Sequence, residues 1–160
     1  MRTLSISDQN QMRRCGQALG KRVRAGDVLA LTGALGTGKT FFVRALGEGM
    51  QLQEPVTSPT FALIQEYHGP IPLIHIDAYR LDDAAAAATL GLEEYFARPA
   101  VFAVEWADRI ATLLPEERLE IFFEAPVPEQ ELRLLHLQAK GERAAALLEM
   151  LERIVQHGQS

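Results

Sequence analysis

The chain has 160 residues, of which 48% are hydrophobic and 23% charged, and this fits one domain with a buried core. With 16 Lys and Arg against 21 Asp and Glu, its net charge is −5, which argues against direct electrostatic binding of nucleic acid. The single cysteine, Cys15, excludes an intrachain disulfide and a multi-cysteine metal site, and it favours a reducing, cytoplasmic setting. Neither a secretory signal nor an apolar run of roughly 20 residues is present, so we expect a soluble protein with no membrane contact.

Apolar and amphipathic segments alternate along the chain. Short apolar segments predict strands at residues 4–6, 28–31, 61–67, 73–76, 101–104, 119–123 and 132–138. Amphipathic or alanine-rich segments predict helices from Ser7 or Asp8 to about Arg24, and at residues 41–50, 82–97, 107–114 and 142–157. The pattern predicts a single α/β domain over residues 1–160, with a mostly parallel central sheet and helices on both faces. The last two strands are close in sequence, and we expect them to pair antiparallel.

Residues 33–40, Gly-Ala-Leu-Gly-Thr-Gly-Lys-Thr, fit the phosphate-binding pattern G-x-x-x-x-G-K-[ST]. The pattern lies between an expected buried strand and an expected amphipathic helix, which is the context that it needs. Its glycines let backbone N–H groups turn toward phosphates, and the helix N-terminus adds positive potential. Lys39 is a candidate for binding the β- and γ-phosphates, and Thr40 for binding Mg²⁺. The expected fold is therefore that of a P-loop NTPase.

Two expected strands end in an acid. Residues 73–76 are followed by Asp77, and residues 101–104 are followed by Glu105. Parallel strands carry both acids to the phosphate-loop side of the sheet, where such folds bind ligands. We predict that one acid holds Mg²⁺ and that the other orients the attacking water.

The segment Val56-Thr57-Ser58-Pro59-Thr60-Phe61 follows the phosphate-loop helix. Ras-type enzymes carry a metal-sensing switch threonine in this interval, which makes Thr60 or Ser58 a candidate for contact with Mg²⁺ or the γ-phosphate. A rigid proline turn with capping hydroxyls is the alternative.

Three further side chains lie near these acids in the sequence. Trp106 directly follows Glu105, and the residue alone favours a packing role at the edge of the sheet. Arg80 is either a charge stabiliser for the transferred phosphoryl group or a salt-bridge partner. For His75 we predict no metal role, because no second His or Cys stands at ligand spacing.

The nucleotide class follows from the lysines. None of the three lysines lies in the guanine-reading pattern N-K-x-D, which favours adenine and hence ATP. No arginine-rich lid is evident, which weakens the interpretation as a small-molecule kinase.

The chain resembles the TsaE (YjeE) family of small bacterial P-loop ATPases over about residues 4–138. The segments that carry this resemblance are GALGTGKT (33–40), TSPTFALIQEY (57–67), HIDAYRL (75–81), GLEEYF (91–96) and VEWADR (104–109). The resemblance implies slow ATP hydrolysis in the biosynthesis of threonylcarbamoyladenosine, a modification of the tRNA adenosine next to the anticodon. It also implies association with the TsaD–TsaB protein pair, which the ATP cycle resets between turnovers.

The same resemblance assigns roles by motif. It implies that Thr40 and Glu105 hold Mg²⁺, that Asp77 assists hydrolysis, and that Trp106 is required beside the metal acid. The candidate catalytic residues are Lys39, Thr60 and Asp77. The candidate nucleotide-binding residues are Asp8, Gly33, Gly36, Thr37, Gly38, Lys39, Thr40, Phe41, Trp106 and Arg133.

The expected cofactors are ATP and Mg²⁺, and the expected partner is a TsaD–TsaB-like complex. The negative charge predicts that tRNA is reached only indirectly, through that complex. Two other interpretations remain open: a small-molecule or nucleoside kinase, and a nucleotide-gated binding module with negligible turnover.

Overall fold

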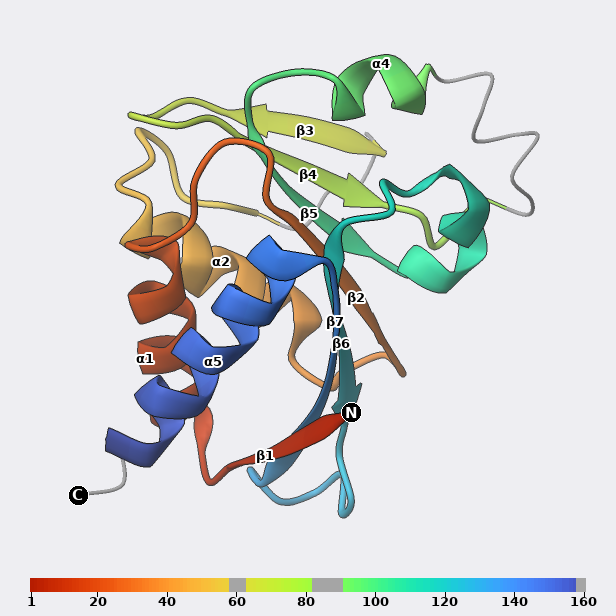
Figure 1. Ribbon diagram of the computed structural model, residues 1–160. Coiled ribbons are helices and arrows are strands. Elements are labelled where there is room, and N and C mark those ends of the chain that lie inside the picture. The colour runs from red at the N-terminus through yellow and green to blue at the C-terminus, as the bar shows by residue number, and fades with distance from the viewer. Residues whose placement is uncertain (58–62, 82–90, 158–160) are drawn as a thin grey trace.

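The computed structural model describes residues 1–57, 63–81 and 91–157, which form a mixed sheet between two layers of helices (Figure 1). The sheet has the strand order β1-β7-β6-β2-β5-β4-β3. Its strands are β1 (Arg2–Ile6), β2 (Val28–Gly33), β3 (Ile64–Tyr67), β4 (Leu73–Asp77), β5 (Val101–Glu105), β6 (Arg118–Glu124) and β7 (Arg133–Lys140). The helices are α1 (Gln9–Gly20), α2 (Lys39–Gly49), α4 (Leu92–Phe96), the 3₁₀ helix η1 (Ala107–Leu113) and α5 (Glu142–His157).

The centre of the sheet is parallel and its edges are antiparallel. Strand β2 pairs in parallel with β5 and β6, and β5 pairs in parallel with β4. Strand β3 lies antiparallel beside β4, and β7 lies antiparallel between β6 and β1. This confirms the predicted mostly parallel centre and the antiparallel pairing of the last two strands.

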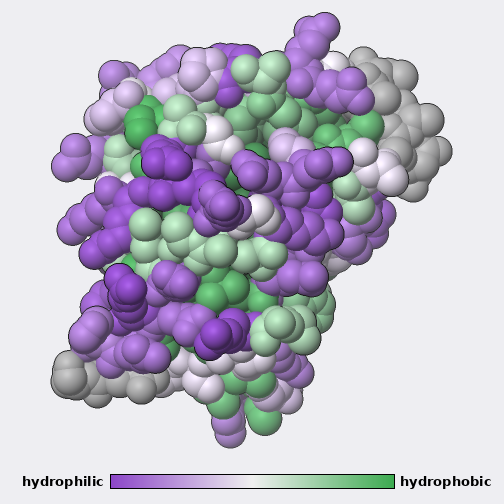
Figure 2. Space-filling model, in the orientation of Figure 1, coloured by the Kyte–Doolittle hydropathy of each residue, from purple (hydrophilic) through white to green (hydrophobic). Residues whose placement is uncertain are grey.

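Helices cover both faces of the central strands, as predicted. Each strand alternates between the faces: β2 sends Leu29 and Leu31 into one hydrophobic cluster, and Val28 and Ala30 into the other. The first cluster lies under α1, α2 and α5, and the second lies under α4 and η1. Figure 2 shows hydrophilic side chains over most of the face that carries α1 and α5, with smaller hydrophobic areas between them.

Two predicted helices differ from the observed ones by more than two residues at one end. The first was expected to reach about Arg24 but ends at Gly20, where the Arg22 N–H bonds to the carbonyl of Leu19 three residues back and tightens the end of the helix. The helix expected over residues 82–97 is described only from residue 91, since residues 82–90 lie outside the described residues. Within the described part, Gly91 has φ +71 and starts α4 afresh, so the prediction of one continuous helix through this point is wrong.

No helix among residues 1–57, 63–81 and 91–157 has the length and apolar character needed to cross a membrane.

Helix α1 packs directly on the phosphate-loop helix α2 through glycines. A Cβ added to Gly49 would lie 2.0 Å from the carbonyl oxygen of Gln17, and one added to Gly20 would lie 2.2 Å from that of Leu46. The two backbones therefore approach as closely as they do only because these positions lack side chains. At its other end, the start of α1 with its N-cap Asp8 lines the same cavity as the phosphate loop.

We predict that Gly49→Ala lowers the free energy of unfolding by about 2–3 kcal/mol, because α1 and α2 must separate to admit the new methyl group. Gly26→Ala is the control, since Gly26 has φ +98 but nothing within 4 Å of an added Cβ. It should cost only about 1 kcal/mol of backbone strain. Denaturant unfolding of both variants checks this, and an equal or smaller cost at Gly49 would contradict the steric account.

Candidate functional site

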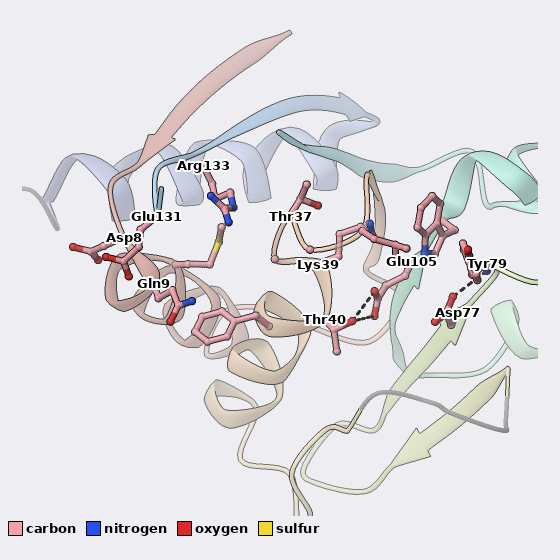
Figure 3. A pocket seen from close by; sticks show the side chains of 16 residues that line it. Asp8, Gln9, Thr37, Lys39, Thr40, Asp77, Tyr79, Glu105, Glu131 and Arg133 are labelled. Carbon is pink, nitrogen blue, oxygen red and sulfur yellow. Dashed lines mark hydrogen bonds between the residues drawn. The ribbon is translucent and has the colours of Figure 1, made fainter. Parts of the chain in front are cut away.

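A cavity of about 400 Å³ opens at the C-terminal ends of the parallel strands, above the first turn of α2 (Figure 3). It is lined by Asp8, Gln9, Met12, Leu35, Gly36, Thr37, Gly38, Lys39, Thr40, Phe41, Asp77, Tyr79, Glu105, Trp106, Glu131 and Arg133. Nearly all the candidate residues thus meet in one place. Gly33 lies at the end of β2 behind the lining, Arg80 is exposed outside it, and Ser58 and Thr60 lie outside the described residues.

The phosphate loop has the backbone conformation that its glycines allow. Gly38 is the N-cap of α2 with φ +108, a left-handed conformation that side chains other than glycine rarely adopt. Gly33 has φ +131, and a Cβ there would lie 2.4 Å from the carbonyl oxygen of Phe123 on β6. The Thr37 hydroxyl closes the loop by donating to the carbonyl of Ala34 at 2.7 Å. The loop is therefore fixed by its own backbone and by its fit against β6.

Lys39 lies folded over the loop and is only 5% exposed. Its Nζ donates to the carbonyls of Gly33 at 2.5 Å and Ala34 at 3.0 Å, and lies 4.2 Å from the centre of the Trp106 ring. Burial is the largest influence and lowers the pKa of this ammonium, although nearby carboxylates, with Glu105 the strongest, act in the opposite direction. A phosphate oxygen would give this poorly solvated cation a fully charged partner in place of neutral carbonyls.

Glu105 ends β5 and joins it to α2. The Thr40 hydroxyl donates to its carboxylate, with Oγ1 2.8 Å from Oε1 and 3.1 Å from Oε2. Its Oε2 also lies 2.5 Å from Nε2 of His75, whose ring is completely buried in β4. The carboxylate, itself 3% exposed, is therefore hydrogen-bonded from two elements.

The hydroxyl and carboxylate oxygens of Thr40 and Glu105 fit Mg²⁺, which prefers hard oxygen ligands. Across the part of the chain that the structure describes, no group of three or more His, Cys, Asp and Glu could hold a metal. Such a sparse protein ligand set is typical of Mg²⁺ bound together with nucleotide phosphates and water, and it does not suit a metal caged by protein alone.

Asp77 lies opposite Glu105 in the parallel pairing of β4 and β5, as their places at the strand ends predict. Its Oδ1 accepts a hydrogen bond from the Tyr79 N–H at 2.9 Å. Burial is the largest influence and raises the pKa of Asp77, the Tyr79 N–H lowers it, and the charge of Glu105 raises it further. Its partial burial and raised pKa give the Asp77 carboxylate the character of a proton acceptor.

Trp106 does more than pack against the edge of the sheet, which was the role favoured by the sequence alone. Its ring contacts Lys39 and also the Tyr79 ring, with 4.9 Å between the two ring centres. Its backbone is left-handed, with φ +57, at the point where β5 turns into η1. Such conformations are uncommon for large residues and cluster at functional sites.

A second group of side chains lies at the other end of the cavity. Figure 3 shows Asp8, Gln9, Glu131 and Arg133 together, on the far side of the phosphate loop from Asp77. Asp8 caps α1 by accepting from the Gln11 N–H at 2.8 Å, so one of its oxygens serves the fold. Arg133 donates to the nearby carbonyls of Gln130 and Leu132. A role for Asp8 or Arg133 toward a nucleotide stays a prediction.

His75 is a residue whose role the sequence does not reveal. Its only candidate role in the sequence is that of a metal ligand, and no second His or Cys stands at ligand spacing. The sequence does contain one signal. Side chains along a strand alternate between the two faces, so His75, two residues before Asp77 at the end of β4, points to the same side of the sheet as Asp77. Its contact with Glu105 depends on the register of β4 against β5, which no local pattern fixes.

Comparison with known proteins shows the family. A family model described as "Threonylcarbamoyl adenosine biosynthesis protein TsaE" matches residues 6–133. The chain belongs to the TsaE family. It is 43% identical to the TsaE of Bacillus subtilis, over 81% of this chain and 80% of that protein. It is 40% identical to the TsaE of Treponema pallidum, over 76% of this chain and 89% of that protein.

A solved structure agrees with this family assignment. The crystal structure of Bacillus subtilis YdiB superposes on the chain with a TM-score of 0.78 and 34% identity. The match covers 95% of this chain and 94% of that one, so the two folds agree over nearly their whole length. The resemblance inferred from the five sequence segments is thereby confirmed at the level of family and fold.

We predict that Asp77→Asn raises the thermal unfolding midpoint at neutral pH by up to about 3 °C, because it removes a desolvated charge beside Glu105. The pKa of Asp77 is raised in the folded protein, so the wild type gains stability as protons bind. The difference should therefore shrink as the pH falls through this raised pKa toward the ordinary value of about 3.9.

The matched control is Asp27→Asn. The Asp27 carboxylate is also buried but is paired with Arg143, at 2.9 and 3.0 Å. Its loss should lower the unfolding midpoint by about 4 °C or more, since charge-assisted hydrogen bonds are broken. If Asp77→Asn destabilises the protein as Asp27→Asn does, Asp77 serves the fold and our interpretation of its environment is wrong.

Proposed function

We propose that this protein is a Mg²⁺-dependent ATPase that acts in tRNA threonylcarbamoyladenosine biosynthesis, in the cytoplasm, by ATP-driven cycling on a TsaD–TsaB-like complex. The pathway is supported by the family, whose relatives are named for tRNA threonylcarbamoyladenosine biosynthesis. The ATPase is supported chiefly by one observation: Lys39, Thr40 and Glu105 converge on one cavity at the N-terminus of α2, with Asp77 beside them.

The phosphate loop binds the triphosphate in this proposal. Backbone N–H groups of the loop and the N-terminus of α2 face the phosphates, and Lys39 leaves its two carbonyl partners to contact the β- and γ-phosphates. Thr40 and Glu105 hold Mg²⁺, which when bound neutralises charge that develops on the phosphates.

Asp77 is then the group that acts on water. Its carboxylate accepts a hydrogen bond from the attacking water and orients it toward the γ-phosphate. Because Glu105 is engaged by Thr40 and His75, Asp77 is the freer of the two acids at this edge of the sheet. The two acids thus have different roles: Glu105 binds Mg²⁺, and Asp77 orients the attacking water.

In this proposal the partner complex, and not this chain, binds the tRNA that is modified. The chain's negative charge disfavours direct contact with the phosphate backbone of tRNA. The proposal therefore places tRNA on the TsaD–TsaB-like complex, while this protein acts on that complex. A kinase would in addition release ADP only when an acceptor molecule is present, which separates that alternative in a single assay.

We predict that Lys39→Ala abolishes the tRNA modification in cells, because the phosphates lose their cation and the loop loses its contact with Trp106. The test is a bacterial strain depleted of its own TsaE and complemented with this chain, with threonylcarbamoyladenosine measured by nucleoside mass spectrometry. Lys21→Ala, at an exposed lysine just after α1, is the matched control and should restore the modification. Normal levels of modification with Lys39→Ala would contradict the proposed function.

A further inference from the structure

A buried polar contact inside the sheet, between His75 and Glu105, has a role beyond leaving Asp77 the freer acid. His75 is completely buried, and its Nε2 lies 2.5 Å from Oε2 of Glu105. The other carboxylate oxygen, Oε1, accepts from the Thr40 hydroxyl at 2.8 Å, and this hydroxyl lies slightly farther, at 3.1 Å, from Oε2. One oxygen of Glu105 is therefore held from inside the sheet, and the other lies beside the candidate Mg²⁺ ligand.

The strand register produces this contact. Asp77 lies opposite Glu105, so His75 lies opposite Ala103, and His75 and Glu105 are diagonal neighbours on one side of the sheet. Ala103 is the smallest of the buried side chains along β5, and it leaves the imidazole free to lean toward the strand end. The imidazole reaches Glu105 from β4 while Thr40 reaches it from α2.

The available protons decide which group donates. An ionised carboxylate only accepts hydrogen bonds, and Thr40 has a single hydroxyl proton to share between the two oxygens of Glu105. Nε2 of His75 must therefore carry a proton and donate it to Oε2. Among the residues that the structure describes, Nδ1 of His75 has no hydrogen-bond partner. A neutral ring protonated at Nε2 leaves only an acceptor unsatisfied there, which costs less than a buried charged donor.

A core built only for packing would carry an apolar side chain at this position. The remaining described neighbours of His75 on β4, Leu73, Ile74 and Ile76, are apolar and fully buried. A ring with an unpartnered nitrogen breaks this local rule, and such exceptions mark functional positions. The group that benefits from it is the Glu105 carboxylate.

We propose that His75 is a positioning residue of the Mg²⁺ site: its Nε2–H fixes the Glu105 carboxylate so that Oε1 faces the metal, or a water bound to it, beside Thr40. The proposal rests on the proposed function and adds a residue to it. Ligating carboxylates are oriented by hydrogen bonds from outside the ligand shell, and loss of such a partner typically lowers metal affinity about 10- to 100-fold.

The chain contains a second histidine–glutamate pair that serves as an internal control. Nε2 of His136 lies 2.8 Å from Oε1 of Glu124, between β7 and β6 and outside the cavity lining. Both its side chains are partly exposed, at 21% and 45%. A variant at His136 therefore removes the same kind of contact without touching the candidate metal site.

The experiment titrates MgCl₂ into the full chain in the presence of a non-hydrolysable ATP analogue. The signal is the fluorescence of Trp106, the chain's one tryptophan, whose ring lines the cavity. We expect His75→Leu to raise the half-saturating Mg²⁺ concentration at least tenfold. His75→Gln should stay within about threefold of wild type, because the glutamine amide places a donor near the position of Nε2. His136→Leu should leave the value unchanged.

A double variant tests whether His75 acts on Mg²⁺ binding through Glu105. If His75 acts through Glu105, then His75→Leu should have no further effect on half-saturating Mg²⁺ once Glu105→Gln is present. Should His75→Leu fail to fold, as judged by circular dichroism, His75→Asn replaces it. The asparagine amide is too short to reach Oε2, so we expect His75→Asn to lose Mg²⁺ affinity where His75→Gln keeps it.

Two results would overturn the inference. One is a Mg²⁺ requirement in His75→Leu, or in His75→Asn, that shifts no more than in His136→Leu. The other is a rise in half-saturating Mg²⁺ concentration in His75→Gln as large as in His75→Leu, which would assign His75 a packing role only. Failure of the proposed function is a separate result: the wild-type chain would then show no Mg²⁺-dependent nucleotide binding, and the role of His75 would fall with it.

Discussion

One buried carboxylate connects the parts of this structure. Glu105 is 3% exposed at the end of a central strand, and a charge buried so deeply must be hydrogen-bonded to be tolerated. Its donors come from two separate elements, Thr40 in the first turn of α2 and His75 inside β4. The register of the sheet, the start of α2 and the position of this carboxylate are therefore coupled, and a shift in any of them disturbs the others.

The charges around this carboxylate explain why the cavity suits a cation and a polyphosphate. Asp77 and Glu105 lie side by side: burial is the largest influence that raises the pKa of Asp77, the charge of Glu105 raises it further, and nearby positive charge opposes this. Lys39 supplies part of that charge but is itself poorly solvated and bonded to neutral carbonyls. A divalent cation would relieve the acids, and phosphates would relieve the lysine, so the two bind best together.

Local patterns in the sequence predict the part of the site that one segment builds. The phosphate loop follows from its own spacing, and the two acids share an edge because parallel strands end together. The His75 contact and the cation–π contact of Trp106 arise from register and from a left-handed turn, which depend on how distant segments pack. The close approach of α1 and α2 through Gly20 and Gly49 likewise depends on how these two helices pack, and no local pattern shows it.

The central claim is that nucleotide turnover in this cavity drives repeated rounds of tRNA modification by a partner complex. The most direct measurement counts modified tRNA molecules per TsaD–TsaB complex, supplied with tRNA, the threonylcarbamoyl donor and this protein. With ATP the count should rise well beyond a single round, and with a non-hydrolysable analogue it should stop near one. Equal counts with ATP and with the analogue would contradict the account, because binding alone would then suffice.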